Sequence, residues 1–578
     1  MSVVKKHPLK RFFRLLELDR KDIVYIYIYA IFEGLISLTI PVGIQAIINL
    51  IALNQFSSSW MLLTFVVALG TAIAGAMKLM QHIITETIQQ RIFTRSAFDF
   101  AYRIPRLQME AIKEEYAPEL INRFFDTLSI QKGIPKVLVD LSAASLQIFF
   151  GLILLSLYHP FFVAFGCVLL ALIVLLVVSS FSPGLSTSLQ ESKYKYKVAY
   201  WLEELGRTMG SFKLAGRTQY PIERTDELVG GYLQYRKKHF SVVKVQIISV
   251  VILKTLATAA LLLIGGILVI NNEMNVGQFV ASEIVIIIVL NALDKIVMGM
   301  ETIFDLLTAV EKIGVVTDLP LEDESGIDFE EIHCENGISI HVDNLTYVLG
   351  EHQHKILENI NLNIKSGERI CIVGSNASGK STLIRIIMGW YDNFRGTISY
   401  NDIPRKNINI ASLRSYMGDH VSEEHLFHGT LAQNISMGRP DVSIQEVIKV
   451  CQKVNLSDYI KSQPEGLNTI ITSDGQNVPQ SVIKKIILAR CIVDLPKLVV
   501  TEPLLAGLDN TDAMQMIDLL TNKQNSWTLI AVTRSAQMAK SCDRIIVMDK
   551  GQITFKGTYE ELEQEAYFEQ LFDDIIKE

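Results

Sequence analysis

One short run of residues, 374–382, has the residue types and the spacing needed to bind a phosphate group. It reads Gly-Ser-Asn-Ala-Ser-Gly-Lys-Ser-Thr, after a strand-like stretch (Arg369 to Val373) and before a helical pattern. In such a loop the glycines let backbone N–H groups surround a phosphate, the lysine reaches the outer phosphates, and the next hydroxyl can ligate Mg²⁺. Because the whole pattern stands in this context, a chance glycine-rich turn explains it poorly. The predicted binding residues are Gly374, Ser375, Asn376, Ala377, Ser378, Gly379, Lys380, Ser381 and Thr382, with Ser381 also a metal ligand.

Length and composition place this loop in a large, apolar chain. The 578 residues are enough for two or three domains, and 49% of them are hydrophobic while 20% are charged. A formal net charge of -7 does not suggest nucleic acid as a partner. The six cysteines include no C-x-x-C pair, so neither a disulfide framework nor a zinc site is indicated.

The first part of the chain contains six apolar stretches that are each long enough to cross a bilayer, which takes about 20 residues. Six such runs in one half of the chain, followed by an ordinary soluble composition, make buried helices of a soluble protein improbable. Glu33 and Glu283 lie within these runs and are candidates for a translocation pathway, or for ion pairs with lysines. The stretches are Val24–Leu50, Trp60–Ile83, Val137–Tyr158, Phe161–Phe181, Val243–Ile270 and Val276–Met298.

The placement of positive charge predicts the orientation in the membrane. Lysine and arginine are frequent in the leading segment and in the two long connections, 84–136 and 182–242, and are absent from the short ones. By the positive-inside rule, both termini and the long connections are cytoplasmic. Within the connections, Ala97–Ile121 and Leu189–Leu214 have helical spacing, so the membrane helices are expected to continue into the cytoplasm. Leu9–Leu18 has the pattern of an amphipathic helix on the inner face.

The rest of the chain has the pattern of a soluble α/β domain. Its apolar runs alternate with helical patterns, as in a mostly parallel sheet. The sequence therefore predicts an all-α six-helix transmembrane domain (1–316), a linker (317–336) and an α/β P-loop NTPase domain (337–578).

This organisation resembles that of the ATP-binding cassette (ABC) exporters, over nearly the whole chain. Local phrases that carry the resemblance are Ile356–Glu368, Leu426–Ile435 and Asp543–Gly557, and Gly277–Ala281 is similar to the type I secretion and peptide-exporting branch. The resemblance implies a half-transporter in the cell (inner) membrane with a cytoplasmic cassette, and ATP and Mg²⁺ as cofactors. It also implies dimerisation, because each ATP site joins one subunit's phosphate loop to the other subunit's signature.

The residues that would hold the metal and the attacking water depart from the family's pattern. Ser422 aligns with the glutamine that normally joins Mg²⁺, and a serine could reach the ion only through water. Glu502 aligns with the metal-coordinating aspartate and remains a hard oxygen ligand. The glutamate that normally polarises the attacking water aligns with Pro503, which has no acceptor side chain.

Three further positions depart from the pattern. The signature aligns with Val478–Val482, in which Pro479 lacks both a hydroxyl and an N–H. The switch histidine aligns with Arg534, a permanent cation that binds phosphate but does not titrate as an acid or base. A surface arginine at a strand end is an equal alternative for that residue. Leu349 stands where an aromatic residue normally stacks on adenine, and Tyr347 is either a displaced platform or, preferably, a core residue.

These departures predict a degenerate site in which no catalytic residue is intact, the degenerate positions being Ser422, Pro503 and Arg534. Such a site is expected to bind ATP but to hydrolyse it poorly. The predicted function is therefore one half of an exporter paired with a second half-transporter, a heterodimer being favoured over a homodimer. A membrane-fusion adaptor protein is a further candidate partner. The alternative from a different class is a non-hydrolysing structural or regulatory membrane subunit of a secretion complex.

Overall fold

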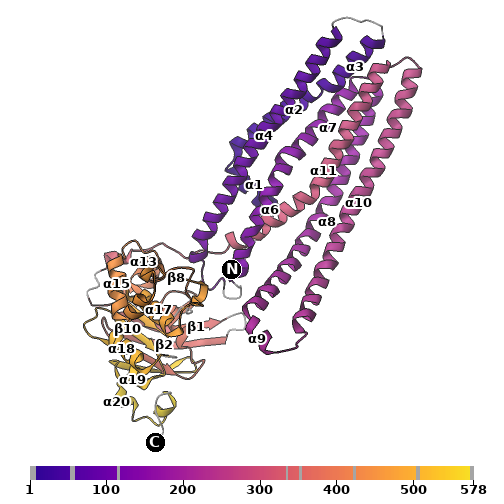
Figure 1. Cartoon of the computed structure of the whole chain (residues 1–578). Coiled ribbons are helices and arrows are strands. Elements are labelled where there is room, and N and C mark those ends of the chain that lie inside the picture. The colour runs from indigo at the N-terminus through magenta and orange to yellow at the C-terminus, as the bar shows by residue number, and fades with distance from the viewer. Residues whose placement is uncertain are drawn as a thin grey trace. The chain divides into compact units, whose positions relative to one another are not determined.

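The structure, a computed structural model, describes residues 8–52, 59–112, 117–332, 336–349, 354–420, 425–502 and 508–572. The chain forms two compact units. The first contains Met1–Arg106 and Glu114–Leu319, and the second contains Leu107–Lys113 and Pro320–Glu578. Figure 1 shows the first unit as long helices and the second as sheets with short helices.

The first unit is helical throughout its described residues, apart from short turns. Its helices are α1 (Pro8–Glu17), α2 (Arg20–Ser37), α3 (Thr39–Ala52), α4 (Ser59–Arg103), α5 (Ala117–Asn122), α6 (Asp126–Pro135), α7 (Ser142–Ser156), α8 (Pro160–Arg207), α9 (Met209–Leu214), α10 (Tyr220–Ile270) and α11 (Val276–Thr317). In the described part of the chain, six helical segments are long and apolar enough to cross a membrane. Each overlaps one of the six stretches predicted from the sequence, so the prediction of six membrane helices is confirmed.

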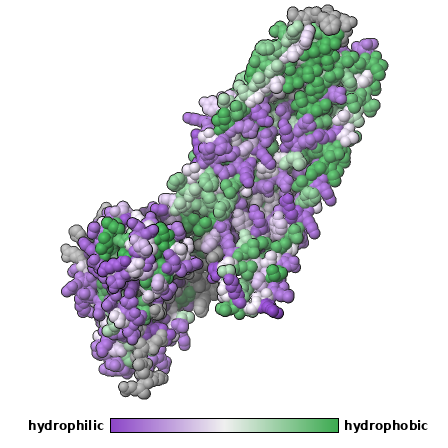
Figure 2. All heavy atoms as spheres, in the orientation of Figure 1, coloured by the Kyte–Doolittle hydropathy of each residue, from purple (hydrophilic) through white to green (hydrophobic). Residues whose placement is uncertain are grey.

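Four of these helices are much longer than a bilayer requires. Helices α4, α8, α10 and α11 contain 45, 48, 51 and 42 residues. At about 1.5 Å per residue, each exceeds a hydrocarbon layer of about 30 Å by roughly a factor of two. Figure 2 shows hydrophobic residues gathered over one end of this unit and many hydrophilic residues over the remainder. The helices thus continue well past their apolar stretches, as the sequence predicts.

The first predicted extension is interrupted. Residues 97–121 were expected to be helical, but α4 ends at Arg103 and only a short 3₁₀ turn, Ile104–Arg106, follows. Pro105 lies in that turn and cannot donate a helical hydrogen bond. Beyond it, Leu107 forms an antiparallel bridge with Leu321 instead of continuing the helix. The continuous helix was therefore a wrong prediction for this part of the segment.

The amphipathic helix α1 is fixed to the end of α11 by one arginine. Phe12 and Leu16 of α1 are buried, and Arg11 on the same helix has only 10% of its side chain exposed. Its guanidinium donates to Glu311 Oε2 at 2.9 Å and to Asp318 Oδ2 at 2.6 Å. A charge-assisted fork of this kind is geometrically specific, so Arg11 sets the position of α1 along α11.

The second unit contains two main sheets. The four-stranded antiparallel sheet has the order β2-β1-β4-β5, and the six-stranded sheet has the order β12-β11-β3-β10-β9-β6. In the latter, β11, β3, β10, β9 and β6 pair in parallel and β12 is antiparallel. The strands of these two sheets are β1 (Ile340–Leu349), β2 (His354–Ile364), β3 (Arg369–Gly374), β4 (Phe394–Tyr400), β5 (Ile403–Pro404), β6 (Met417–His420), β9 (Leu498–Thr501), β10 (Thr528–Val532), β11 (Arg544–Asp549) and β12 (Gln552–Gly557).

Strands β3, β9 and β10 are buried along their whole length. A parallel strand covered on both faces is expected to be apolar without alternation, and the polar residues of these strands stand only at their ends. The helices of this unit include α12 (Lys380–Ile387), α13 (Ile410–Ser415), α14 (Leu431–Ser436), α15 (Ile444–Lys453), α17 (Gln480–Ile492), α18 (Asn510–Thr521) and α19 (Ala536–Lys540). The predicted α/β domain with a mostly parallel sheet is confirmed.

The fork at Arg11 gives the first testable prediction. Replacing Arg11 by Met keeps the volume but leaves two carboxylates without their shared partner, which is expected to destabilise the folded chain by about 2 kcal/mol. Thermal unfolding of the purified full chain in detergent should show a lower melting temperature. Arg14→Met, at an exposed position of the same helix, is the matched control. Equal melting temperatures for both variants would show that the fork contributes nothing.

Candidate nucleotide site

The phosphate loop follows β3 and leads into α12, and two of its glycines have no room for a side chain. Gly374 has φ 147°, and a Cβ there would lie 2.1 Å from the carbonyl oxygen of Met548. Gly379 has φ 97°, and a Cβ there would lie 2.7 Å from Leu357 Cδ2. Both positions combine a left-handed backbone with close packing, which only glycine tolerates. The loop is therefore held in its curved path by packing against β2 and β11.

Lys380 opens α12, and its side chain folds back over the loop. Its Nζ donates to the carbonyl oxygens of Gly374 at 2.8 Å and Ser375 at 2.7 Å, and it lies 3.2 Å from Ser378 Oγ. Burial lowers the pKa of this ammonium, the charge of Arg534 lowers it further, and the carboxylate of Glu502 acts in the opposite direction. The charges of Lys380, Arg534 and Glu502 therefore act on one another.

A cavity of about 540 Å³ lies along the loop. It is lined by Lys355, Ile356, the residues 377–382, Lys550 and Gly551. This volume falls within the range of small-molecule binding sites, about 300–1,000 Å³. Lys380 and Lys550 give the lining a positive character that suits a phosphate chain, whereas Lys355 is paired with Glu358 Oε1 at 2.5 Å. The contribution of Lys550 and Gly551 was not predicted, although they lie in the family-like phrase Asp543–Gly557.

Glu502 and Arg534 reach this site because their strands are neighbours of β3. Strand β10 pairs with β3 on one side and with β9 on the other. Glu502 comes directly after β9, and Arg534 comes two residues after β10 and is exposed. The carboxyl ends of parallel strands meet at one edge of the sheet, where ligands of such folds bind. Ser422 and Pro503 lie outside the described residues.

The segment aligned with the family's signature starts a helix. Pro479 is the N-cap residue of α17, and its side chain makes no capping hydrogen bond. Val478 before it is buried, whereas Pro479 and Gln480 are exposed. Serine, threonine, aspartate or asparagine at this position would accept a backbone hydrogen bond, and proline cannot. The helix dipole is present, but the N-cap residue has no hydroxyl.

Tyr347 is a core residue. Its side chain is 3% exposed, and its ring stacks on that of Tyr391 with centroids 5.5 Å apart and planes 7° from parallel. Its hydroxyl donates to Glu110 Oε1 at 3.3 Å. A ring held in this way does not present a face to a nucleotide, so the core interpretation of Tyr347 is the one the structure supports. The side chain of Leu349 lies outside the described part of the chain.

Comparison with known proteins identifies both units. Residues 357–503 match the family model of ABC transporters, and residues 23–293 match that of the ABC transporter transmembrane region. The chain has the two domains of an ABC exporter half-transporter. The fold agrees: a bacterial Atm1-family ABC exporter with ATP bound superposes with a TM-score of 0.82, covering 96% of this chain and 99% of that one, at 18% identity.

Curated relatives of this half-transporter carry different names. An ATP-dependent lipid A-core flippase of Francisella tularensis is 28% identical over 266 residues, 46% of this chain and 43% of the relative. A lactococcin-G-processing and transport ATP-binding protein of Lactococcus lactis is 24% identical over 327 residues, 56% of this chain and 46% of the relative. An uncharacterized ABC transporter ATP-binding protein of Bacillus subtilis is 27% identical over 54% of each chain. The matches thus span about half the length of these relatives.

The geometry of the loop gives the second prediction. Removing the ammonium by Lys380→Ala should abolish photolabelling of the full half-transporter by an azido-ATP analogue, because the outer phosphates lose their principal cation. Lys365→Ala, an exposed lysine away from the cavity lining, should leave labelling unchanged. Equal labelling of wild type and Lys380→Ala would show that the nucleotide does not use this loop.

Proposed function

We propose that this chain is one half of a dimeric membrane exporter that binds Mg-ATP through residues 374–382 and hydrolyses it slowly. The observation that carries the proposal is the parallel pairing of β3, β10 and β9, which brings the glycine loop with Lys380, Arg534 and Glu502 to one edge of the sheet. Two cations and one carboxylate at the carboxyl edge of the sheet suit a polyphosphate with a divalent cation. The curved, tightly packed backbone at Gly374 and Gly379 supplies the phosphate-binding surface.

Magnesium fits the residues present. The Ser381 hydroxyl follows the loop lysine, and Glu502 is a partly exposed carboxylate whose charge reaches Lys380. Oxygen ligands of this kind are the ones Mg²⁺ prefers, together with substrate phosphates and water. When bound, the ion would neutralise phosphate charge. Ser381 and Glu502 would hold it, and Lys380 and Arg534 would balance the remaining negative charge.

Slow hydrolysis follows from the residues that act on water. Pro503 has no acceptor atom on its side chain, so it cannot orient or deprotonate an attacking water molecule. Arg534 binds phosphate as a permanent cation but cannot accept a proton. Phosphoryl transfer depends on positioning the nucleophile as much as on charge compensation. The site therefore supports binding more strongly than turnover, which is the sense in which it is degenerate.

The partner we favour is a second, different half-transporter. Dimerisation is a property of ABC exporters, and each site needs a signature from the other subunit. A homodimer of this chain would have Pro503 in both sites and the altered segment Val478–Val482 facing both. A partner with an intact carboxylate and signature would supply at least one working set of catalytic residues.

The alternative is a non-hydrolysing structural or regulatory membrane subunit. It is favoured by Pro479, which leaves the start of α17 without a side-chain cap, because the partner's ATP would then also meet an altered signature. Identification of the chain that co-purifies with this one discriminates the two functions. A membrane-fusion adaptor among the co-purifying proteins would support secretion through two membranes and the type I secretion branch.

The proposed location is the inner membrane, with both termini and the cassette in the cytoplasm. The six apolar helical segments support a multi-pass protein, and the lysine and arginine excess in the long connections supports the orientation. The names of the relatives cover both lipid and peptide transport, so they do not select a branch of the family.

Slow hydrolysis gives the third prediction. The purified full chain should turn over ATP well below about 1 s⁻¹, an ordinary enzyme rate, because loss of one well-placed catalytic contact costs about 10²–10³ in rate. Pro503→Glu should raise the rate, and Pro503→Gln, which cannot accept a proton in the same way, is the matched control. A wild-type rate of about 1 s⁻¹ or more would show that another residue positions the water. Glu502 would then be the first candidate.

The end of α8 gives the fourth prediction. We expect the turn between α8 and α10 to dock on the cassette of the opposite subunit, as in the family. Gly210 lies in the short helix α9 of this connection and is exposed, and a side chain there would meet no atom within 4 Å. Gly210→Cys carrying a benzophenone should therefore cross-link to a second cassette, giving a product larger than the single 64.9 kDa chain.

The control for this cross-link is Gly230→Cys, another open glycine on α10. Mass spectrometry of the product locates the cross-linked peptide. Cross-links from Gly210→Cys that join only segments of one chain would refute the swapped arrangement.

A further inference from the structure

A second cavity, of about 680 Å³, lies inside the helical unit. Its lining comes from α4, from α6 and the residue that follows it, and from α8 and α11. In three of these helices the lining residues lie just beyond an apolar stretch: 126–136 precede Val137, 188–195 follow Phe181, and 302–309 follow Met298. The cavity therefore sits at the polar end of the membrane-spanning segments, and its volume is that of a small-molecule site.

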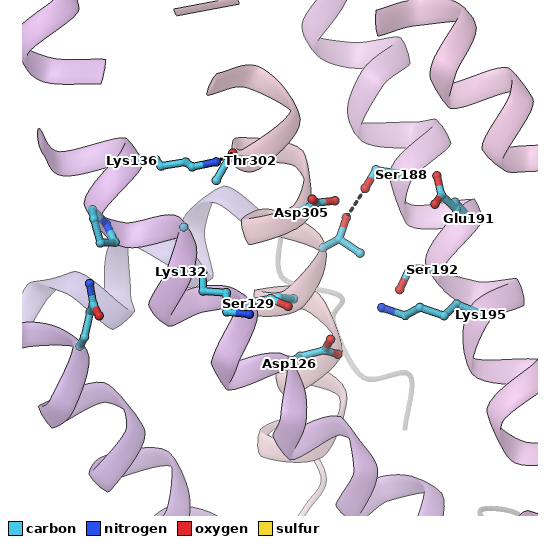
Figure 3. A pocket seen from close by; sticks show the side chains of 15 residues that line it. Asp126, Ser129, Lys132, Lys136, Ser188, Glu191, Ser192, Lys195, Thr302 and Asp305 are labelled. Carbon is cyan, nitrogen blue, oxygen red and sulfur yellow. Dashed lines mark hydrogen bonds between the residues drawn. The ribbon is translucent and has the colours of Figure 1, made fainter. Parts of the chain in front are cut away.

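Three lysines face this cavity from two sides. Figure 3 shows Lys132 and Lys136 on one wall and Lys195 reaching in from α8 on the other. Lys136 Nζ donates to Thr302 Oγ1 at 3.3 Å, and Lys195 Nζ lies 5.4 Å from the centre of the Tyr196 ring. Among the described residues, none of the three lysines forms an ion pair with a carboxylate. Lys195 also interacts electrostatically with Asp126 and Asp305 of the same lining, so Lys132 and Lys136 supply the positive charge most available to a ligand.

The lining also contains three acidic residues, of which Glu191 is paired with an arginine. Asp126 accepts a hydrogen bond from the Tyr196 hydroxyl. Glu191 accepts from Arg236 Nη1 at 3.3 Å. Asp305 is the third carboxylate and is exposed to the cavity. A bond from a neutral hydroxyl leaves the charge of Asp126 in place, so among the described residues three ammonium groups face two carboxylates without an ion-pair partner, Asp126 and Asp305, and the balance is positive by one charge.

A buried hydroxyl adds a hydrogen-bond donor. Ser192 on α8 is only 7% exposed and lines the cavity, and its Oγ has no hydrogen-bond partner among the described residues. One turn away, Ser188 Oγ and Thr308 Oγ1 are 2.9 Å apart and satisfy each other. A buried polar atom without a partner is costly, so an acceptor from a ligand at Ser192 would relieve that cost.

We propose that this cavity binds an anionic group, a phosphate or a carboxylate, between Lys132, Lys136 and Lys195, with Ser192 as an additional donor. The inference rests on the proposed function, since an exporter must hold its substrate at the cytoplasmic end of its helices before transport. The anion comes either from a soluble organic acid or from a lipid headgroup. A cationic solute is disfavoured, because it would meet the excess positive charge of the three lysines.

The test uses the purified full chain in nanodiscs of phosphatidylcholine, without nucleotide. The probe is a tri-glutamate peptide labelled with rhodamine, and its binding is followed by fluorescence anisotropy against a tri-lysine peptide with the same label. The variants are Lys132→Gln and Lys195→Gln, both at exposed positions that tolerate substitution. The matched control is Lys193→Gln, an exposed lysine on α8 outside the lining, and Lys195→Arg tests rescue by charge.

We expect the tri-glutamate probe to bind wild type and the tri-lysine probe not to bind. Each Gln variant should weaken binding about tenfold or more, whereas Lys193→Gln and Lys195→Arg should bind as wild type does. In nanodiscs of phosphatidylglycerol, loss of probe binding identifies a lipid headgroup as the occupant, and unchanged binding identifies a soluble anion.

Absence of tri-glutamate binding to wild type, or equal binding by wild type and both Gln variants, would overturn the proposal. Azido-ATP labelling of the same preparations reports the nucleotide site separately. Normal labelling without probe binding therefore rejects the anion site alone, and probe binding without labelling rejects the proposed ATP-dependent function alone.

Discussion

The parallel pairing of β3 with β10, and of β10 with β9, is the constraint on which the candidate nucleotide site depends. In this register Cys371 lies beside Ala531, and Ala531 lies beside Thr501. The three strands consequently end at one level, so that the loop after β3, Arg534 after β10 and Glu502 after β9 emerge together. A shift of one residue in either pairing would reverse the faces of a buried strand and separate these groups.

The charges assembled there explain why binding and hydrolysis can separate in this chain. Lys380 is partly buried and lies near the permanent charge of Arg534. Both effects lower the pKa of the Lys380 ammonium. A polyphosphate would relieve this repulsion, and Glu502 would help to hold its cation. Nothing in that balance requires a base for water. A chain with Pro503 can therefore still bind ATP favourably, although it lacks the side chain that would orient the attacking water.

Much of this organisation could be predicted from the sequence, because it depends on local patterns. Apolar stretches predicted the six membrane helices, and the loop 374–382 stood in its strand–helix context. The break after Arg103 could not be predicted from spacing, because Leu107 bridges to the distant Leu321. The burial of Tyr347 against Tyr391 and the cluster of Lys132, Lys136 and Lys195 arise from tertiary packing. Such packing brings together residues that no sequence window contains.

The most direct measurement of the central claim is an experimental structure of the purified full chain determined with Mg-ATP after prolonged incubation. The account predicts an intact ATP whose phosphates contact the loop 374–382 and Lys380, with Arg534 on the γ-phosphate and Glu502 beside the metal ion. ADP in this site, or an ATP whose γ-phosphate lies away from Arg534 and Lys380, would contradict it.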